Sequence, residues 1–154
     1  MKPLIVLLAA FGLILGATYL VNGQLDYRLA GNGAMAAMLL FTGAAHFAFT
    51  QGMTQMLPVW LPFRRAWVYG TGVLEIAAAV GLLWPPARTA AAWALLAFFA
   101  AVLPANIHAA RLHLNYQQGD ATGPSLRYLW FRVPLQLLFM AWTWYFGLHL
   151  AQGQ

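Results

Sequence analysis

The sequence predicts an all-α, polytopic membrane protein, a bundle of membrane-spanning helices that forms a single membrane domain over residues 1–154. Hydrophobic residues make up 62% of the chain and charged residues only 7%, whereas soluble domains carry about 25% charged residues. So few charges cannot cover a water-exposed surface. The apolar residues also gather into long runs separated by stretches rich in glycine and proline, which is the pattern of consecutive spans.

Each apolar run approaches the ~20 residues that a helix needs to cross the hydrocarbon layer of a bilayer. The expected spans are residues 3–21, 33–49, 66–84, 88–110 and 128–150. The first run is longer than the roughly 7–15 residues of a signal-peptide core, and no cleavage pattern follows it cleanly. We therefore expect residues 3–21 to remain as a helix.

The second run is the shortest of the five, and the third follows the sequence MLPVWLPFRR at residues 56–65. The two prolines of residues 56–65 lie four residues apart, which favours an interfacial elbow over a span in this segment. The fourth run follows WPPAR and contains Pro104, which cannot donate a hydrogen bond to the carbonyl of Ala100 and should kink its helix. The fifth run carries two polar side chains near its start.

The distribution of basic residues predicts an orientation. With five spans, one side of the membrane receives Lys2, Arg64, Arg65, Arg111 and Arg127, and the other receives Arg28 and Arg88. Because loops rich in Lys and Arg stay in the cytoplasm, the amino terminus should be cytoplasmic, in a bacterial inner membrane. The Lys and Arg residues that give the net charge of +5 are dispersed between the apolar runs. This distribution indicates membrane topology and no nucleic-acid partner.

Several kinds of chemistry are excluded by residue type. The chain has no cysteine, so it forms neither a thiolate metal site nor a dithiol redox pair. His108 and His113 are five residues apart and miss the spacing that places two ligands on one helical face, so no metal site is expected. The GNG at 31–33 lacks the context of a dinucleotide-binding loop. Any redox role therefore requires a bound cofactor, which favours an accessory subunit over a self-sufficient enzyme.

Glu75 lies in the middle of the third run, where a carboxylate costs several kcal/mol unless it is protonated, paired or hydrated. Counting ~1.5 Å per residue from each helix end places a group of polar side chains in the same half of the membrane. These candidates for ligand binding or proton relay are His46, Glu75, Asn106, Arg132 and Gln136. We expect one connected cluster with Glu75 at its floor, within reach of the long Arg132 side chain, and an almost wholly apolar opposite half.

The same residues also have structural interpretations, which the sequence leaves open. Glu75 can be half of a structural ion pair or a protonated carboxyl bonded to a neighbouring helix. His46 can serve as a structural hydrogen-bonding residue, and Asn106 and Gln136 can bond between helices. Arg132 can instead extend to the membrane interface.

Five short motifs occur in an order that resembles a known family. They are FTGAAHF at 41–47, LPVWLP at 57–62, TGVLEIAAAVGLLWP at 71–85, LPANIHAA at 103–110 and FRVPLQ at 131–136. Together they resemble the DoxX/DoxD-like membrane proteins over residues 35–147. The resemblance implies a four-helix core, to which the run 3–21 is an N-terminal addition, and an association with quinone-linked redox systems.

Three functions remain for such a bundle. The first is a redox-associated membrane protein that binds a quinone or a similar small carbonyl compound in its polar cluster, with Arg132 or His46 polarising the carbonyl and Glu75 carrying a proton. The second is a non-enzymatic assembly or stability factor for a membrane complex, and the third a small-solute transporter. The expected partners are the lipid bilayer, with another membrane or redox subunit, or a second copy of the chain, left open.

Overall fold

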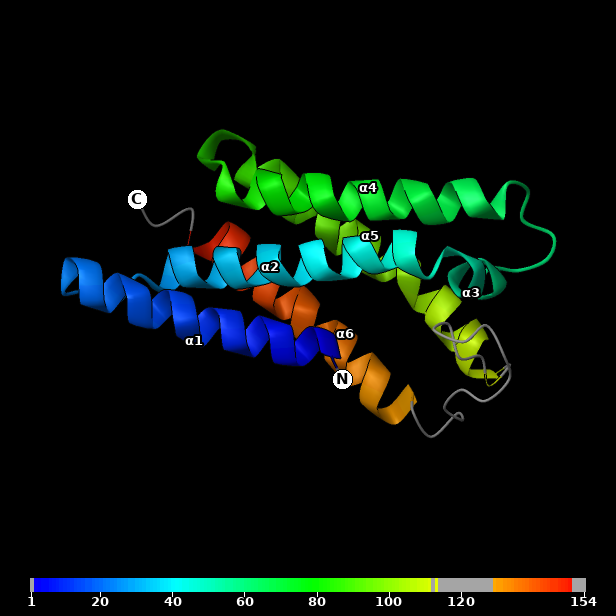
Figure 1. Cartoon of the computed structure of the whole chain (residues 1–154), viewed down its shortest axis with the longest axis horizontal. Helices are drawn as coiled ribbons and strands as arrows, with labels where there is room; N and C mark the ends of the chain where they lie inside the picture. The colour runs from blue at the N-terminus through cyan, green and yellow to red at the C-terminus, as the bar shows by residue number, and fades with distance from the viewer. Residues whose placement is uncertain (1, 112, 114–128, 151–154) are drawn as a thin grey trace.

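The computed structural model describes residues 2–111, 113 and 129–150, and all regular structure in these residues is helical (Figure 1). The helices are α1 (Lys2–Asn22), α2 (Tyr27–Ala48), α3 (Thr50–Gln55), α4 (Arg64–Leu83), α5 (Pro85–Arg111) and α6 (Leu129–Thr143), and a π-helical segment, η2 (Trp144–His149), continues α6. The all-α prediction is therefore confirmed for the described residues. Residue 128, where the fifth expected span begins, and Arg127 lie outside them.

Three helices in the described part of the chain, α1, α4 and α5, are long and apolar enough to cross a membrane. They contain the first, third and fourth expected spans. This finding supports a membrane location. The second expected span lies mostly within α2, and the fifth is divided between α6, which has 15 residues, and η2, which has 6.

Helix α2 begins at Tyr27, earlier than the predicted start at residue 33. Asp26 caps it, because its carboxylate accepts a hydrogen bond of 2.8 Å from the backbone N–H of Leu29. This cap draws Arg28 and Asn32, which resemble loop residues in the sequence, into the first turns of the helix. By contrast, α5 begins with two prolines, which fit the first turn of a helix because the N–H groups there need no helical partner.

The connection from α2 to α4 contains the short helix α3 and then non-helical residues 56–63, which form the expected elbow. Phe63 adopts a left-handed backbone conformation with φ 54° immediately before α4. Three large apolar side chains are more than four-fifths exposed here: Val59, Trp60 and Phe63. Exposed aromatic residues at one end of the bundle are typical of the membrane–water interface.

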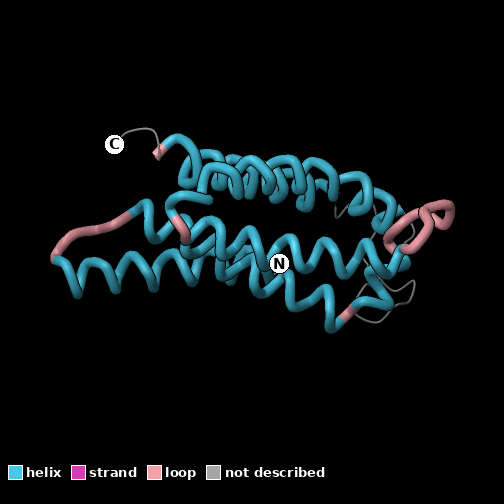
Figure 2. Tube along the Cα trace, turned by 90° about the horizontal axis from the view of Figure 1, so that it is seen from above, coloured by secondary structure: helices cyan, strands magenta, loops and turns pink. Residues whose placement is uncertain are grey.

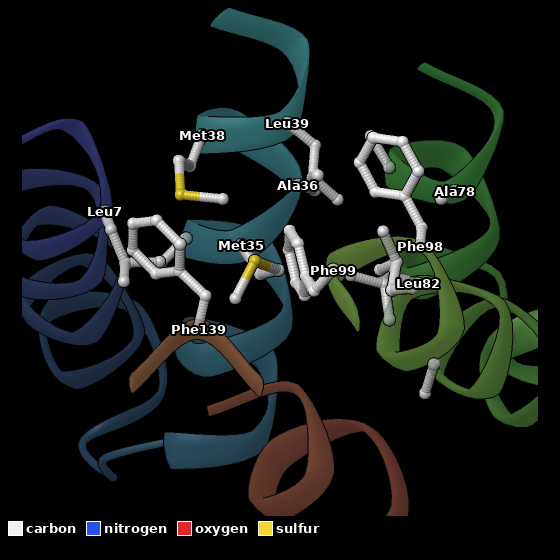
Figure 3. Close-up of a cluster of buried hydrophobic side chains, with 14 of the residues drawn as sticks. Leu7, Met35, Ala36, Met38, Leu39, Ala78, Leu82, Phe98, Phe99 and Phe139 are labelled. Atoms are coloured by element: carbon white, nitrogen blue, oxygen red, sulfur yellow. The ribbon is translucent and has the colours of Figure 1, made fainter. Parts of the chain in front are cut away.

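The helices run roughly lengthwise, with the loops at the two ends of the bundle (Figure 2). Helix α2 packs against α1 on one side and α4 on the other, and α5 packs between α4 and α6. Figure 3 shows the apolar core where α1, α2, α4, α5 and α6 meet. Its largest fully buried apolar side chains are Leu7, Met35, Met38, Leu39, Leu82 and Leu95.

The half of the bundle away from the elbow is not wholly apolar, contrary to our expectation. Asn32 is only 2% exposed, and its amide donates hydrogen bonds to the carbonyls of Arg28 at 3.0 Å and Phe146 at 2.9 Å. The indole N–H of Trp142 donates to the carbonyl of Gly31 at 3.0 Å. These bonds join α2 to α6 and η2, so the polar groups in this half are used for packing between helices.

Candidate functional site

His46 and Glu75 face each other across the contact between α2 and α4. The His46 Nδ1 atom lies 3.7 Å from Oε2 of Glu75, and the two side chains are 17% and 7% exposed. Within the described part of the chain, Glu75 Oε2 has no hydrogen-bond partner. The structure therefore brings together the two ionisable candidates of these helices, but leaves one carboxyl oxygen without a hydrogen bond.

Two glycines make room for this pair. A Cβ atom on Gly72 would lie 2.8 Å from the Cβ of His46, and one on Gly43 would lie 3.5 Å from the Cβ of Glu75 and 2.9 Å from Cγ1 of Ile76. His46 thus lies opposite Gly72, and Glu75 lies opposite Gly43. On each helix the ionisable residue follows the glycine by three residues. Small residues at a helix crossing allow the backbones to approach closely, which places the two side chains within reach of each other.

Thr42, one turn before His46, defines the hydrogen bonding of the imidazole. Its carbonyl lies 2.9 Å from His46 Nδ1, and because a carbonyl only accepts, Nδ1 carries the proton of this bond. In the neutral imidazole, Nε2 is then a hydrogen-bond acceptor. The Thr42 side chain also interacts with the Glu75 carboxyl.

An exposed aromatic pair lies next to the His46–Glu75 pair. The rings of Phe47 and Tyr69 stack with a centroid distance of 5.7 Å and an interplanar angle of 28°. Both side chains are about two-fifths exposed, and the Phe47 ring lies close to the position that a Cβ on Gly72 would occupy. An apolar, π-rich surface therefore adjoins the buried polar groups on the outside of the bundle.

Asn106 and Arg132 form a second pair, between α5 and α6. The guanidinium Nη2 donates to Oδ1 of Asn106 at 3.0 Å. Asn106 is 5% exposed, and its Nδ2 has no hydrogen-bond partner among the described residues. Glu75 makes its ion-pair contact with His46, and no ion pair between Arg132 and Glu75 occurs among the described residues.

Gln136 lies one turn after Arg132 and is buried. Its Nε2 donates to the carbonyl of Phe99 at 2.9 Å, which is adjacent to the Ala100 carbonyl that Pro104 cannot serve. Helix α5 continues through this proline. The Gln136 contact joins α5 to α6 and matches the interhelical role that the sequence left open for this residue.

The sequence candidates thus divide into two groups. His46 and Glu75 join α2 to α4, whereas Asn106, Arg132 and Gln136 join α5 to α6, and no hydrogen bond or ion pair connects the groups within the described residues. In Figure 1, α2 and α5 end, and α4 and α6 begin, toward the same end of the bundle. Counting residues along each helix does not predict which side chains face each other.

The sequence reasoning did not identify Thr42, Gly43, Phe47 and Tyr69 as parts of the site. The signal for the first two was available as spacing, because Thr42 and Gly43 precede His46 by four and three residues and so share its helix face. The stacking of Phe47 on Tyr69 depends on how two helices are rotated and has no signature in one sequence. No group of three or more potential metal ligands occurs among the residues that were placed.

Three described helices that are long and apolar enough to cross a membrane indicate that this molecule is a helical protein of the membrane. The chain belongs to a family described as a domain of unknown function (DUF8561), whose model matches residues 35–147. Helix α1 precedes the matched region. Comparisons with curated proteins and with solved structures found no match.

Proposed function

We propose that this chain is a redox-associated, DoxX-like integral membrane protein that binds a small quinone-type molecule at the His46–Glu75 pair. The observation that supports this most directly is Glu75, a residue that is 6% exposed and whose Oε2 has no hydrogen-bond partner in the described residues. A buried carboxyl is costly in apolar surroundings unless another group bonds to it. A ligand that exchanges a hydrogen bond or a proton with Glu75 would provide that group.

The two side chains have complementary roles in this proposal. A protonated Glu75 donates a hydrogen bond to a quinone carbonyl, and an ionised Glu75 accepts one from a quinol hydroxyl. His46, with Nδ1 bonded to the Thr42 carbonyl, presents Nε2 as an acceptor when neutral. It can polarise a carbonyl only when Nε2 is also protonated, so binding and protonation are linked at this site.

The approach from the bilayer follows the exposed aromatic pair. Quinone rings are planar and apolar on their faces, and the rings of Phe47 and Tyr69 offer a stacking surface beside Gly72. Such a ligand reaches the polar pair from the lipid phase without crossing the interior of the bundle. An isoprenoid tail would remain among the lipid chains.

The proposal includes the arrangement in the membrane. Helices α1, α2, α4 and α5 each cross once, and α6 continued by η2 crosses a fifth time. The amino terminus then lies in the cytoplasm of a bacterial cell, because more basic residues fall on that side than on the other.

A role as an assembly or stability factor is the second candidate. It is favoured by the fully engaged interhelical bonds of Gln136, Asn32 and Trp142, which lock the bundle without a ligand. In that case the His46–Glu75 pair would only add to the packing. The two functions differ in whether a small molecule occupies the site.

Extraction of the protein in mild detergent, followed by mass spectrometry of bound small molecules and an absorption spectrum, tests the proposal. We expect a quinone to co-purify and a short-chain benzoquinone to bind to protein from which it has been removed. The Phe47→Ala variant should bind the benzoquinone more weakly, whereas Trp93→Ala, an exposed aromatic change on α5, should bind it as the wild type does. Absence of binding by a folded wild-type protein would contradict the proposal.

A further inference from the structure

The Asn106–Arg132 pair presents hydrogen-bond donors with no acceptor to match them in the described residues. We infer that this pair binds a phosphate-type oxyanion between α5 and α6, at a site separate from the His46–Glu75 pair. The inference does not depend on quinone binding. It rests on the orientation of one buried amide, the guanidinium donors beside it and the charge of this end of the bundle.

The orientation of the Asn106 amide follows from its partner. Arg132 has only donors, so the amide atom 3.0 Å from its Nη2 must be the oxygen. The other amide atom, Nδ2, is then a donor. It is buried in a side chain that is 5% exposed and has no acceptor in the part of the chain that was placed. An unsatisfied buried donor costs about 1–3 kcal/mol, which an acceptor from a ligand would recover.

The guanidinium adds further donors beside this amide. Arg132 is partly exposed, and its described hydrogen bond uses only Nη2. Guanidinium groups bind phosphate and carboxylate oxygens with two parallel hydrogen bonds because their donors form a planar fork. Donors from Asn106 and Arg132 together therefore suit a group with several negatively charged oxygens.

The surrounding charges favour an anion over a neutral carbonyl compound. Arg111 ends α5 one turn beyond Asn106, and Arg64 and Arg65 begin α4 at the same end of the bundle. The described acids lie elsewhere, since Asp26 caps the start of α2 and Glu75 contacts His46. A basic site at a helix end fits the phosphate of an anionic phospholipid headgroup or of a soluble phosphate compound.

Thermal unfolding of the detergent-solubilised protein tests the inference, with phosphatidylglycerol, phosphatidylcholine or glycerol phosphate added in separate titrations. We expect phosphatidylglycerol or glycerol phosphate to raise the Tm of the wild type, and phosphatidylcholine to raise it less. A response to the lipid alone identifies a headgroup site, and a response to glycerol phosphate alone identifies a soluble ligand. Either response supports the inference if the variants below change it.

The decisive variant is Asn106→Asp, because aspartate keeps an oxygen for Arg132 but removes the Nδ2 donor and repels an anion. Its apparent affinity should fall by at least roughly tenfold, which corresponds to about 1.4 kcal/mol. Arg132→Lys keeps the charge but lacks the planar fork, and should also weaken binding, which provides a second reading if Asn106→Asp does not fold. Lys2→Gln removes an exposed charge on α1, a helix that carries neither residue of the pair, and should bind as the wild type does.

Three results would overturn the inference. The first is that neither phosphatidylglycerol nor glycerol phosphate raises the Tm of the wild type more than phosphatidylcholine does. The second is an unchanged response in folded Asn106→Asp or Arg132→Lys protein. The third is an equal loss in Lys2→Gln, which would show that the anions respond to general surface charge.

Discussion

A carboxyl group inside a membrane helix needs a proton, a partner or water, and at Glu75 the neighbouring residues limit which of these is available. His46 is the nearest ionisable side chain, but its Nδ1 is already bonded to the Thr42 carbonyl. Arg132, the stronger cation, bonds to Asn106 instead. Glu75 therefore lacks the strong ion pair that would make it purely structural.

This separation predicts that Glu75 and Arg132 contribute independently to stability. In a double-mutant cycle with Glu75→Gln and Arg132→Gln, the effects on the free energy of unfolding should add within about 0.5 kcal/mol, because the two side chains share no polar partner. The matched cycle of Glu75→Gln with His46→Gln should show a coupling of roughly 0.5–3 kcal/mol, as expected for residues in contact. Denaturation in detergent measures both cycles. Stronger coupling of Glu75 to Arg132 than to His46 would contradict the described pairing.

At the scale of the elements, the crossing of α2 and α4 determines the geometry of the pair. The backbones approach at Gly43 and Gly72, where the Gly43 carbonyl would lie 3.3 Å from a Cβ on Gly72. Any side chain at these positions must push the helices apart or displace His46. The distance between His46 and Glu75 thus depends on two residues that carry no functional group.

The substitution Gly72→Ala tests this dependence. Its methyl group would meet the Cβ of His46 at 2.8 Å, and such overpacking costs typically about 1–3 kcal/mol. Gly70→Ala is the matched control on the same helix, because nothing lies within 4 Å of its added Cβ. We expect Gly72→Ala to lower the Tm and to weaken benzoquinone binding, while Gly70→Ala leaves both near the wild-type values. Equal effects of the two changes would argue against a crossing that depends on Gly72.

The sequence predicts helices better than it predicts the pairing of their side chains. Apolar runs identify the helices that contain the expected spans because burial in lipid requires apolar residues. The start of α2 is predicted too late, because the cap at Asp26 carries Arg28 and Asn32 into the helix. The short helix α3 has too few apolar residues to be predicted from hydropathy. The π-helical hydrogen bonding of η2, which continues α6, is not predicted by residue types.

The candidate site was predictable in depth but not in rotation about the helix axes. Counting residues places His46, Glu75, Asn106 and Arg132 in one half of the bundle because the rise per residue is nearly constant. Which faces meet depends on crossing angles and close packing, as at Gly72. The described hydrogen bonds and ion pairs form two separate pairs, and the single connected cluster stays a prediction.

At the scale of the whole molecule, the exposed elbow lies toward the end of the bundle where α2 and α5 end and α6 begins. Val59, Trp60 and Phe63 protrude there from the connection to α4, as aromatic and apolar residues do at the interface. The other end is held by Asn32 and Trp142. The molecule thus has one end suited to ligands and charge, and one end joined by structural hydrogen bonds.

Reporter fusions at the two termini test the proposed arrangement in the membrane. With five crossings, the amino terminus should report the cytoplasm and the carboxyl terminus the opposite compartment. The physical reason is the excess of basic residues at the end that carries Arg64 and Arg65. Both termini in one compartment would require an even number of crossings and would contradict the five-span proposal.

The central claim is that Glu75 serves a ligand and not only the packing, and the Glu75→Gln variant tests it most directly. The amide has nearly the same shape, keeps hydrogen-bonding capacity and removes the cost of a buried charge. Benzoquinone binding and thermal unfolding are measured on the same detergent-solubilised preparation, beside the wild type. We predict a Tm close to that of the wild type together with the loss of benzoquinone binding. Wild-type binding by a stable Glu75→Gln protein would contradict the claim and leave the His46–Glu75 pair with a structural role.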